Sequence, residues 1–389
     1  MFNVNISIEE NEILGNLIVD SYFFDKSKYE YAFYLYKDNE VSDRQWYSES
    51  MKVGFDVEDE SGFFHIRCFI RDKEAMNIRG YNSEKLSINA NAYNIDSWKK
   101  AVKKTNLQEF EKELDIENGI YQFALENSTI DILFDGLERF KLNRGILVCF
   151  SGAITNRKSK YAPFFSGLNI AQKLDMPIIS VADPSIAMSN QLALAWYAGN
   201  RNVKNLPNFI ADILDIVSIK FSTKLTLFGG SGGGFAALAV AERVSRPTNV
   251  VVWNPQTSIS EYLKNSVINY LTICFPNNNE SVDIYSRLES TGINHDLLVN
   301  YEETEKEFNI LYLQNLGDEL HLQSHAKPLM QKLDIKQSNE NCYFSEQGIT
   351  FWLKYWGEGH IVPSEDVITK SLLEMIDNKT SKEIAESLI

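Results

Sequence analysis

The sequence has no excess of basic charge. It contains 38 lysine and arginine residues against 53 aspartate and glutamate residues, which gives a formal net charge of -15. A surface of this sign repels phosphate backbones, so we expect no nucleic-acid partner. A local basic cluster in residues 98–107 is expected to be a solvated helix face.

Cysteine is also scarce, with four residues, none in CxxC spacing and each next to apolar or aromatic residues. We therefore expect buried free thiols and no cysteine metal site. No apolar run is long enough to cross a membrane as a helix. The first residues have no basic region followed by an apolar one, as a signal peptide would. These absences predict a cytoplasmic protein without a membrane span.

The pattern of residues divides the chain into three parts. Residues 1–95 contain runs of aromatic and β-branched residues, separated by the turn sequences KDNE and DESG. Such spacing predicts a small antiparallel β-sandwich. Residues 96–125 are charged with helical spacing, so we expect a connecting helix there.

Residues 126–389 are predicted to form a doubly wound α/β domain. Short apolar runs alternate here with helical segments, which is typical of parallel strands covered by helices on both faces. Small or polar residues follow each run, and ligands bind at the carboxyl ends of such strands. The runs are 129–135, 145–152, 176–184, 224–230, 248–255, 308–315 and 349–356.

The stretch KLTLFGGSGGGFAAL brackets one serine, Ser231, with glycines. Gly229 to Gly233 match G-x-S-x-G between an apolar run and an alanine-rich helix. This pattern is typical of a nucleophile elbow, in which small residues allow a tight turn that lifts the serine above the sheet. Two alternatives stay open, a phosphate-binding loop and a turn without chemical function. The run lacks the Lys-Ser/Thr ending of an ATP-binding loop.

An elbow serine needs a histidine and an acid later in the chain. Asp318, within NLGDELH, and His360, within YWGEGHIV, both follow apolar runs in that order. The imidazole can take the serine proton, and the carboxylate can fix the imidazole tautomer. Glu319 and Glu358 are alternative acids.

A pair of histidines, His321 and His325, has the i, i+4 spacing that can bind a metal. The pair lacks the HExxH order and a clear third ligand. We expect both side chains on an exposed helix face and predict no metal site.

An oxyanion hole requires two backbone donors. Gly232 directly follows the serine, and Gly152 or Ala153 follows an earlier strand. The alternative for residues 152 and 153 is a plain turn. Ser151 and Asp183 are weaker candidates for substrate contact, and Asp183 is equally well explained as the N-cap of a helix.

Residues 126–389 resemble the α/β-hydrolase superfamily, through GGSGG, GDE and GEGH in that order. More narrowly, VCFSGA, ISVADPS and the glycine-bracketed serine resemble two bacterial groups. One is the XcbB/CpsF family of capsular polysaccharide biosynthesis proteins. The other is the glycan O-acetyltransferase component of the accessory secretion system for serine-rich adhesins. A β-rich region before the hydrolase part is a further similarity.

The resemblance implies a Ser231-His360-Asp318 acyl-enzyme that transfers acetyl groups to a capsule or surface glycan. Acetyl-CoA would be the donor, with no cofactor bound. Implied partners are a glycan or small acyl substrate and other glycan biosynthesis proteins. Two alternatives stay open: a carbohydrate or other esterase, and a non-catalytic partner in a glycan assembly complex.

Overall fold

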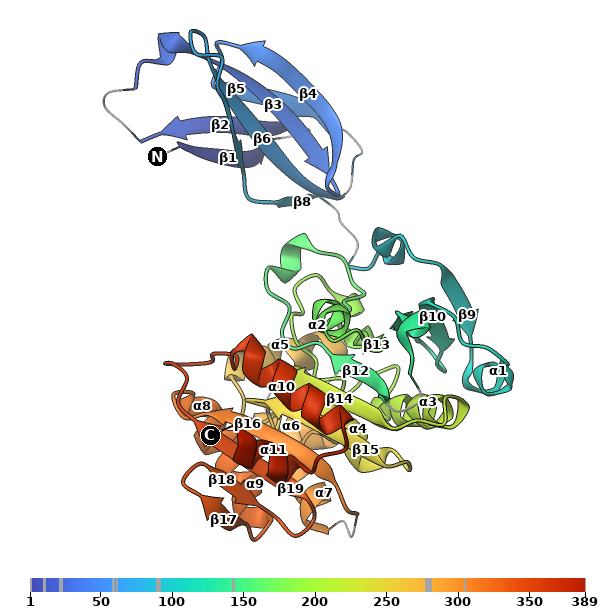
Figure 1. Ribbon diagram of the computed structural model, residues 1–389. Helices are drawn as coiled ribbons and strands as arrows, with labels where there is room; N and C mark the ends of the chain where they lie inside the picture. Colours follow the sequence, from blue (N-terminus) through green and yellow to red (C-terminus); the bar gives the residue numbers. More distant parts are fainter. Residues whose placement is uncertain are drawn as a thin grey trace. The chain divides into compact units, whose positions relative to one another are not determined.

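The computed structural model describes residues 2–9, 12–20, 24–57, 60, 62–88, 92–141, 144–276, 282–303 and 306–388. The chain divides into two compact units (Figure 1). The first comprises Met1–Ala92 and Asn156–Lys160, and the second comprises Tyr93–Thr155 and Tyr161–Ile389.

The first unit consists of two antiparallel sheets. Residues such as Phe33, Ile66 and Val53 alternate along the strands with more exposed ones, so each sheet turns one face to a shared apolar core. The smaller sheet has the order β1-β2-β5, and the larger has the order β4-β3-β6-β7 with β8 paired to β6. The strands are β1 (Phe2–Glu9), β2 (Glu12–Val19), β3 (Tyr29–Lys37), β4 (Glu40–Ser48), β5 (Lys52–Asp56), β6 (Gly62–Asp72), β7 (Ile78–Asn82) and β8 (Leu86–Ile88).

The second unit is built on an eleven-stranded sheet with the order β17-β18-β19-β16-β15-β14-β12-β13-β11-β10-β9. The six strands from β19 to β13 are parallel, whereas β11 runs antiparallel to β13. All seven predicted apolar runs form strands. The strands are β9 (Val102–Thr105), β10 (Gly119–Ala124), β11 (Thr129–Asp135), β12 (Ile146–Phe150), β13 (Ile178–Val181), β14 (Leu225–Gly230), β15 (Thr248–Trp253), β16 (Asn309–Asn315), β17 (Lys336–Asn339), β18 (Cys342–Phe344) and β19 (Ile349–Lys354).

Helices cover both faces of this sheet. Successive residues of a strand point to opposite faces of the sheet, and both faces of β12 are apolar. Val148 belongs to one apolar cluster and Leu147 to another. The first cluster takes in α3, α4, α5, α7 and α9, and the second takes in α2, α10 and α11. The helices are α1 (Leu107–Lys112), α2 (Leu168–Lys173), α3 (Leu206–Lys220), α4 (Gly232–Arg243), α5 (Lys264–Cys274), α6 (Ile284–Thr291), α7 (Leu297–Glu303), α8 (Glu319–His321), α9 (Lys327–Lys332), α10 (Glu365–Ile376) and α11 (Ser381–Ser387).

This is the α/β-hydrolase fold, so the predicted fold class is confirmed. When the strands are counted from β10, the second strand is β11, which runs antiparallel to its neighbours. The fourth strand, β13, lies between the second, β11, and the third, β12. The turn with Ser231 follows the fifth strand, β14. The turns with Asp318 and His360 follow β16 and β19, the seventh and the last strand in this count.

The prediction of a connecting helix over 96–125 is wrong. This segment contains β9, the six-residue helix α1 and β10. Ile120 and Phe123 are fully buried in β10, where they pair with β11 and β9, so burial in the sheet outweighs the helical spacing of the charged residues. Gly119 begins β10 with a φ of 146°, a conformation that breaks a helix.

The four cysteines are free and buried, as predicted. Over the described ranges, we find no helix with the length and apolarity needed to cross a membrane.

Candidate active site

Ser231 occupies a strained turn between β14 and α4. Its backbone angles are φ 55° and ψ -122°, which a residue with a side chain rarely adopts. The glycines around it permit the turn: a Cβ atom on Gly229 would lie 2.5 Å from the carbonyl oxygen of Gly233. The geometry is that of a nucleophile elbow, with the serine at the N-terminus of a twelve-residue helix.

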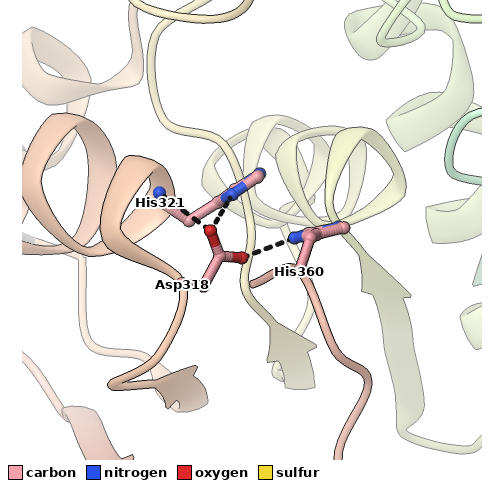
Figure 2. A group of neighbouring side chains, drawn as sticks. All are labelled: Asp318, His321 and His360. Atoms are coloured by element: carbon pink, nitrogen blue, oxygen red, sulfur yellow. Dashed lines mark hydrogen bonds and ion pairs between the residues drawn. The ribbon is translucent and has the colours of Figure 1, made fainter. Parts of the chain in front are cut away.

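Asp318 and His360 come together at the same edge of the sheet. Asp318 Oδ2 accepts a hydrogen bond from His360 Nδ1 at 2.5 Å (Figure 2). The Asp318 side chain is almost fully buried, whereas 42% of the His360 side chain is exposed. The alternative acids point elsewhere, since Glu319 bonds to Gln323 and Glu358 to Tyr355.

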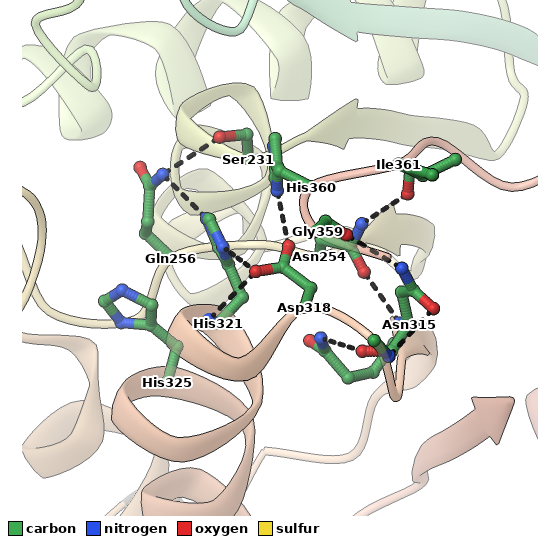
Figure 3. A network of polar contacts seen from close by, with 12 residues as sticks. Ser231, Asn254, Gln256, Asn315, Asp318, His321, His325, Gly359, His360 and Ile361 are labelled. Atoms are coloured by element: carbon green, nitrogen blue, oxygen red, sulfur yellow. Dashed lines mark hydrogen bonds and ion pairs between the residues drawn. The ribbon is translucent and has the colours of Figure 1, made fainter. Parts of the chain in front are cut away.

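The loop that carries His360 is held by asparagines at the ends of the parallel strands. Asn315 Nδ2 donates to the carbonyl oxygens of Gly357 and Gly359 at 2.8 and 2.9 Å. Asn254 Nδ2 donates to the carbonyl oxygen of Ile361 at 2.8 Å (Figure 3). Both asparagines are buried, so these bonds fix the backbone on either side of the imidazole.

Asp318 also bonds to a second imidazole. Its Oδ1 accepts from His321 Nδ1 at 2.9 Å, and the rings of His321 and His360 stack with centroids 4.2 Å apart (Figure 2). Burial alone would raise the pKa of Asp318, but the hydrogen bonds from His321 and His360 outweigh it and hold this pKa well below its usual range. The carboxylate therefore stays ionised between its two partners.

The prediction that His321 and His325 lie on an exposed helix face is wrong. They are 2% and 0% exposed, because the turn after Asp318 packs against the loop that follows β15. Burial lowers the pKa of His321, and it lowers the pKa of His325 to about 3. Both rings are consequently neutral at physiological pH.

Ser231 and His360 line one cavity of about 850 Å³. Among the hydrogen bonds of the described residues, none joins Ser231 directly to His360. Ser231 Oγ instead accepts a hydrogen bond from Gln256 Nε2 at 2.9 Å (Figure 3). The cavity walls are mostly apolar. The lining residues are Cys149, Phe150, Gly152, Ala153, Thr155, Phe165, Ser166, Gly167, Leu168, Asn169, Ile170, Phe228, Gly230, Ser231, Trp253, Tyr262, His360, Val362 and Ile368.

The residues predicted for the oxyanion hole lie beside the serine. Gly152 and Ala153 line the cavity, and a Cβ atom on Gly152 would lie 3.9 Å from Ser231 Cβ. Gly232 is the first residue of α4, where backbone N–H groups have no partner within the helix. These positions suit donors aimed at an oxygen bound near Ser231 Oγ.

Ser151 and Asp183, predicted as weak substrate contacts, do not line this cavity. The Ser151 backbone N–H donates to the Tyr197 hydroxyl, and its Oγ bonds to Ser166. Asp183 accepts from the backbone N–H groups of Ser185 and Tyr197, which is its alternative role as an N-cap. Both side chains are occupied by the turns that they stabilise.

Three residues of the site were not predicted in this role. Gln256 bonds to Ser231, and Trp253 and Tyr262 line the cavity. The signal for Gln256 was its position in NPQT, a polar stretch at the end of a predicted strand.

Asp318, His321 and His360 also form the kind of group that can hold a metal ion, with ligand atoms within 4.8 Å of one another. The Nδ1 atoms of His321 and His360 are each hydrogen-bonded to the Asp318 carboxylate. A cation between them would have to displace those protons, so the present geometry fits an imidazole–carboxylate network better than a metal site.

No family model matches the chain, and no curated protein matches its sequence. Among solved structures, it is similar to an S-formylglutathione hydrolase from Agrobacterium tumefaciens, with 13% identity over 70% of this chain and 95% of that one and a TM-score of 0.40. It is also similar to acetyl xylan esterase 1 from Thermoanaerobacterium sp. JW/SL YS485, with 11% identity over 73% of this chain and 95% of that one and a TM-score of 0.40. A third similar structure is the acylaminoacyl peptidase of Pyrococcus horikoshii, with 12% identity over 100% of this chain and 59% of that one and a TM-score of 0.49.

Proposed function

We propose that the protein is a serine esterase that works through an acyl-enzyme. The observation that carries this proposal is the shared cavity, which brings the strained Ser231 to the same walls as a His360 imidazole anchored on Asp318. A nucleophile, a base and an acid that orients the base are the parts that such chemistry needs.

The reaction follows from these positions. Ser231 Oγ attacks an ester carbonyl and its proton passes to His360 Nε2, while Nδ1–H stays bonded to Asp318. The N–H groups of Gly232 and of the 152–153 turn bind the oxyanion. His360 then protonates the leaving alcohol. In the second half, it takes a proton from water, which attacks the acyl-enzyme, and it then returns this proton to Ser231 Oγ as the acid is released.

The cavity walls favour an uncharged ester with an apolar part. The described residues that line the cavity include neither lysine nor arginine, so a phosphate or carboxylate would lose its hydration without gaining a cation. Phe165, Leu168 and Ile170 supply apolar contact area. The exposed side of His360 gives water access to the acyl-enzyme, which favours hydrolysis.

A second candidate is transfer of an acyl group, such as acetyl, to a sugar hydroxyl of a bacterial glycan. The volume of the cavity supports it, because about 850 Å³ can hold an acceptor beside the acyl group. In this reaction the sugar hydroxyl takes the place of water and gives its proton to His360. Acetyl-CoA is the weaker donor, since the lining offers no cation for its phosphates, and a neutral acetyl ester is the better one.

The proposal is tested with a fluorophosphonate probe and with p-nitrophenyl acetate. We expect covalent labelling at Ser231, hydrolysis of the ester, and loss of both in Ser231→Ala and His360→Ala. Labelling that persists in folded Ser231→Ala, or no reaction of the wild type with either reagent, would contradict the proposal. Adding a glycan acceptor and measuring acetylated sugar against free acetate separates transfer from hydrolysis.

A further inference from the structure

Gln256 is a fully buried residue whose side-chain amide contacts three parts of the site. Its Oε1 accepts from Trp196 Nε1 at 2.6 Å. Its Nε2 lies 2.9 Å from Ser231 Oγ and 3.1 Å from His321 Nε2 (Figure 3). Both amide hydrogens and one lone pair of the amide oxygen are therefore engaged, each with another side chain.

Chemistry fixes the direction of each of these bonds. An indole N–H can only donate, so the amide oxygen must face Trp196 and the amide nitrogen must face the other two atoms. The nitrogen has two hydrogens to donate, one to Ser231 Oγ and one to His321 Nε2. His321 Nε2 consequently accepts, and its ring proton must be on Nδ1, where it donates to Asp318 Oδ1.

The same directions constrain the serine hydroxyl. Because Ser231 Oγ accepts from Gln256, its own proton cannot point to that amide and is free for another acceptor. His360 lines the same cavity, and because its Nδ1 donates to Asp318, the acceptor atom of its neutral ring is Nε2.

We propose that Gln256 and His321 are positioning residues that orient the Ser231 hydroxyl so that its proton is delivered to His360. This inference rests on the proposed function. The chain Trp196–Gln256–His321–Asp318 holds one face of Oγ, and Asp318 holds the base through its second oxygen. The serine and its base are thus oriented from the same carboxylate by two separate routes.

The electrostatics of His321 support this arrangement. Burial lowers the pKa of His321, while the hydrogen bond to Asp318 acts in the opposite direction. A neutral ring is required, because an imidazolium would place an N–H group against the amide N–H of Gln256. The ring stacking of His321 on His360 adds a second contact between the two routes.

Two substitutions of Gln256 separate orientation from packing. Gln256→Met keeps the length of the side chain and removes its hydrogen bonds. Gln256→Glu keeps the shape, but sets a carboxylate oxygen against Ser231 Oγ, where it accepts the proton intended for His360. The matched control is Gln122→Met, since Gln122 Nε2 also makes two bonds, to the Tyr93 hydroxyl and to Asp131.

The readout is fluorophosphonate labelling of Ser231, resolved into the maximal labelling rate and the probe concentration at half-maximal rate. We expect the maximal rate to fall about 10- to 100-fold in Gln256→Met and further in Gln256→Glu, with the half-maximal concentration unchanged. Gln122→Met should label as the wild type does. A folded Gln256→Met with the wild-type maximal rate would overturn the inference and leave the proposed function intact.

A second measurement does not depend on activity or on stable variants. Nitrogen-15 NMR of the histidine rings in the wild-type protein should show His321 with a proton on Nδ1 and none on Nε2. The opposite tautomer would overturn the inference. A wild type that fails to label at Ser231 overturns the proposed function, and the inference falls with it.

Discussion

Gly229 and Gly233 approach each other across the turn that carries Ser231, so that a Cβ atom on Gly229 would lie 2.5 Å from the Gly233 carbonyl oxygen. That oxygen belongs to the backbone of α4 and cannot rotate away as a side chain could. A small residue two positions before the serine is thus required by the contact between strand and helix. One is also required two positions after it, because a Cβ atom on Gly233 would lie 2.3 Å from the Phe150 carbonyl oxygen at the end of β12. The sequence pattern and the strained turn have one physical cause.

Gly229→Ala should destabilise the protein and displace the Ser231 hydroxyl. Forcing a methyl group into this contact costs about 1–3 kcal/mol of unfolding free energy. The change is measured as a lower urea midpoint together with slower fluorophosphonate labelling. Gly54→Ala is the control, because its Cβ would meet the flexible Glu12 side chain at 3.2 Å. An unchanged midpoint and labelling rate in Gly229→Ala would show that the turn can relax.

The fold could be predicted from sequence because strands buried on both faces leave continuous apolar runs. All seven such runs became strands, and the residues after three of them brought Ser231, Asp318 and His360 to one edge of the sheet. The carboxyl ends of parallel strands lie at the same edge of the sheet, so residues that directly follow such strands are brought to that edge.

Residues 96–125 and the inner network could not be predicted in the same way. β10 is a short strand at a partly antiparallel edge, and its pairing with β11 depends on contacts that periodicity does not encode. The i, i+4 spacing of His321 and His325 predicts that they share a helix face, but it does not indicate that this face is buried. Gln256 is held by a hydrogen bond from Trp196, 60 residues earlier, and no local sequence pattern predicts such a bond.

Asp318→Asn should lower the labelling rate about 10³- to 10⁴-fold. An asparagine has one acceptor oxygen for two imidazole N–H groups, and its amide would face the second ring as a donor. At least one histidine must then change tautomer or lose its bond. The rate is measured with fluorophosphonate under identical conditions for both proteins.

Glu319→Gln and Glu358→Gln are the controls for this substitution, because they remove the alternative acids while Asp318 keeps both histidines. Each should label at nearly the wild-type rate. A large loss in either control, with Asp318→Asn near the wild type, would transfer the role of the acid to that glutamate.

Removal of metal ions should leave labelling unchanged. Although Asp318, His321 and His360 have ligand atoms within 4.8 Å of one another, both Nδ1 atoms are engaged with the carboxylate through protons. Dialysis against EDTA, followed by elemental analysis and labelling, tests this expectation. A loss of rate that Zn²⁺ restores would show that the three residues hold a metal in the active protein.

Asp183 should give the protein a measurable pH dependence of stability. Burial raises the pKa of Asp183 to about 6, despite the backbone hydrogen bonds from Tyr197 and Ser185. The folded state thus keeps this proton to a higher pH than the unfolded state, whose carboxyl group titrates near 3.8. The contribution to stability is greatest at low pH and is lost as pH rises from about 4 to about 6, by about 3 kcal/mol in total.

The pH effect of Asp183 is isolated by comparing the wild type with Asp183→Asn in urea unfolding from pH 4 to pH 7. The unfolding free energy of the wild type should fall relative to that of the variant across this window and then level off. Asp175 is a control of opposite sign, because its hydrogen bond and attraction to Lys141 lower its pKa. Asp175→Asn should therefore lack a contribution that the wild type gains as pH rises through the acidic range and then keeps. A wild-type free energy that rises relative to Asp183→Asn between pH 4 and pH 6 would mean that the bonds from Tyr197 and Ser185 outweigh the burial of the charge.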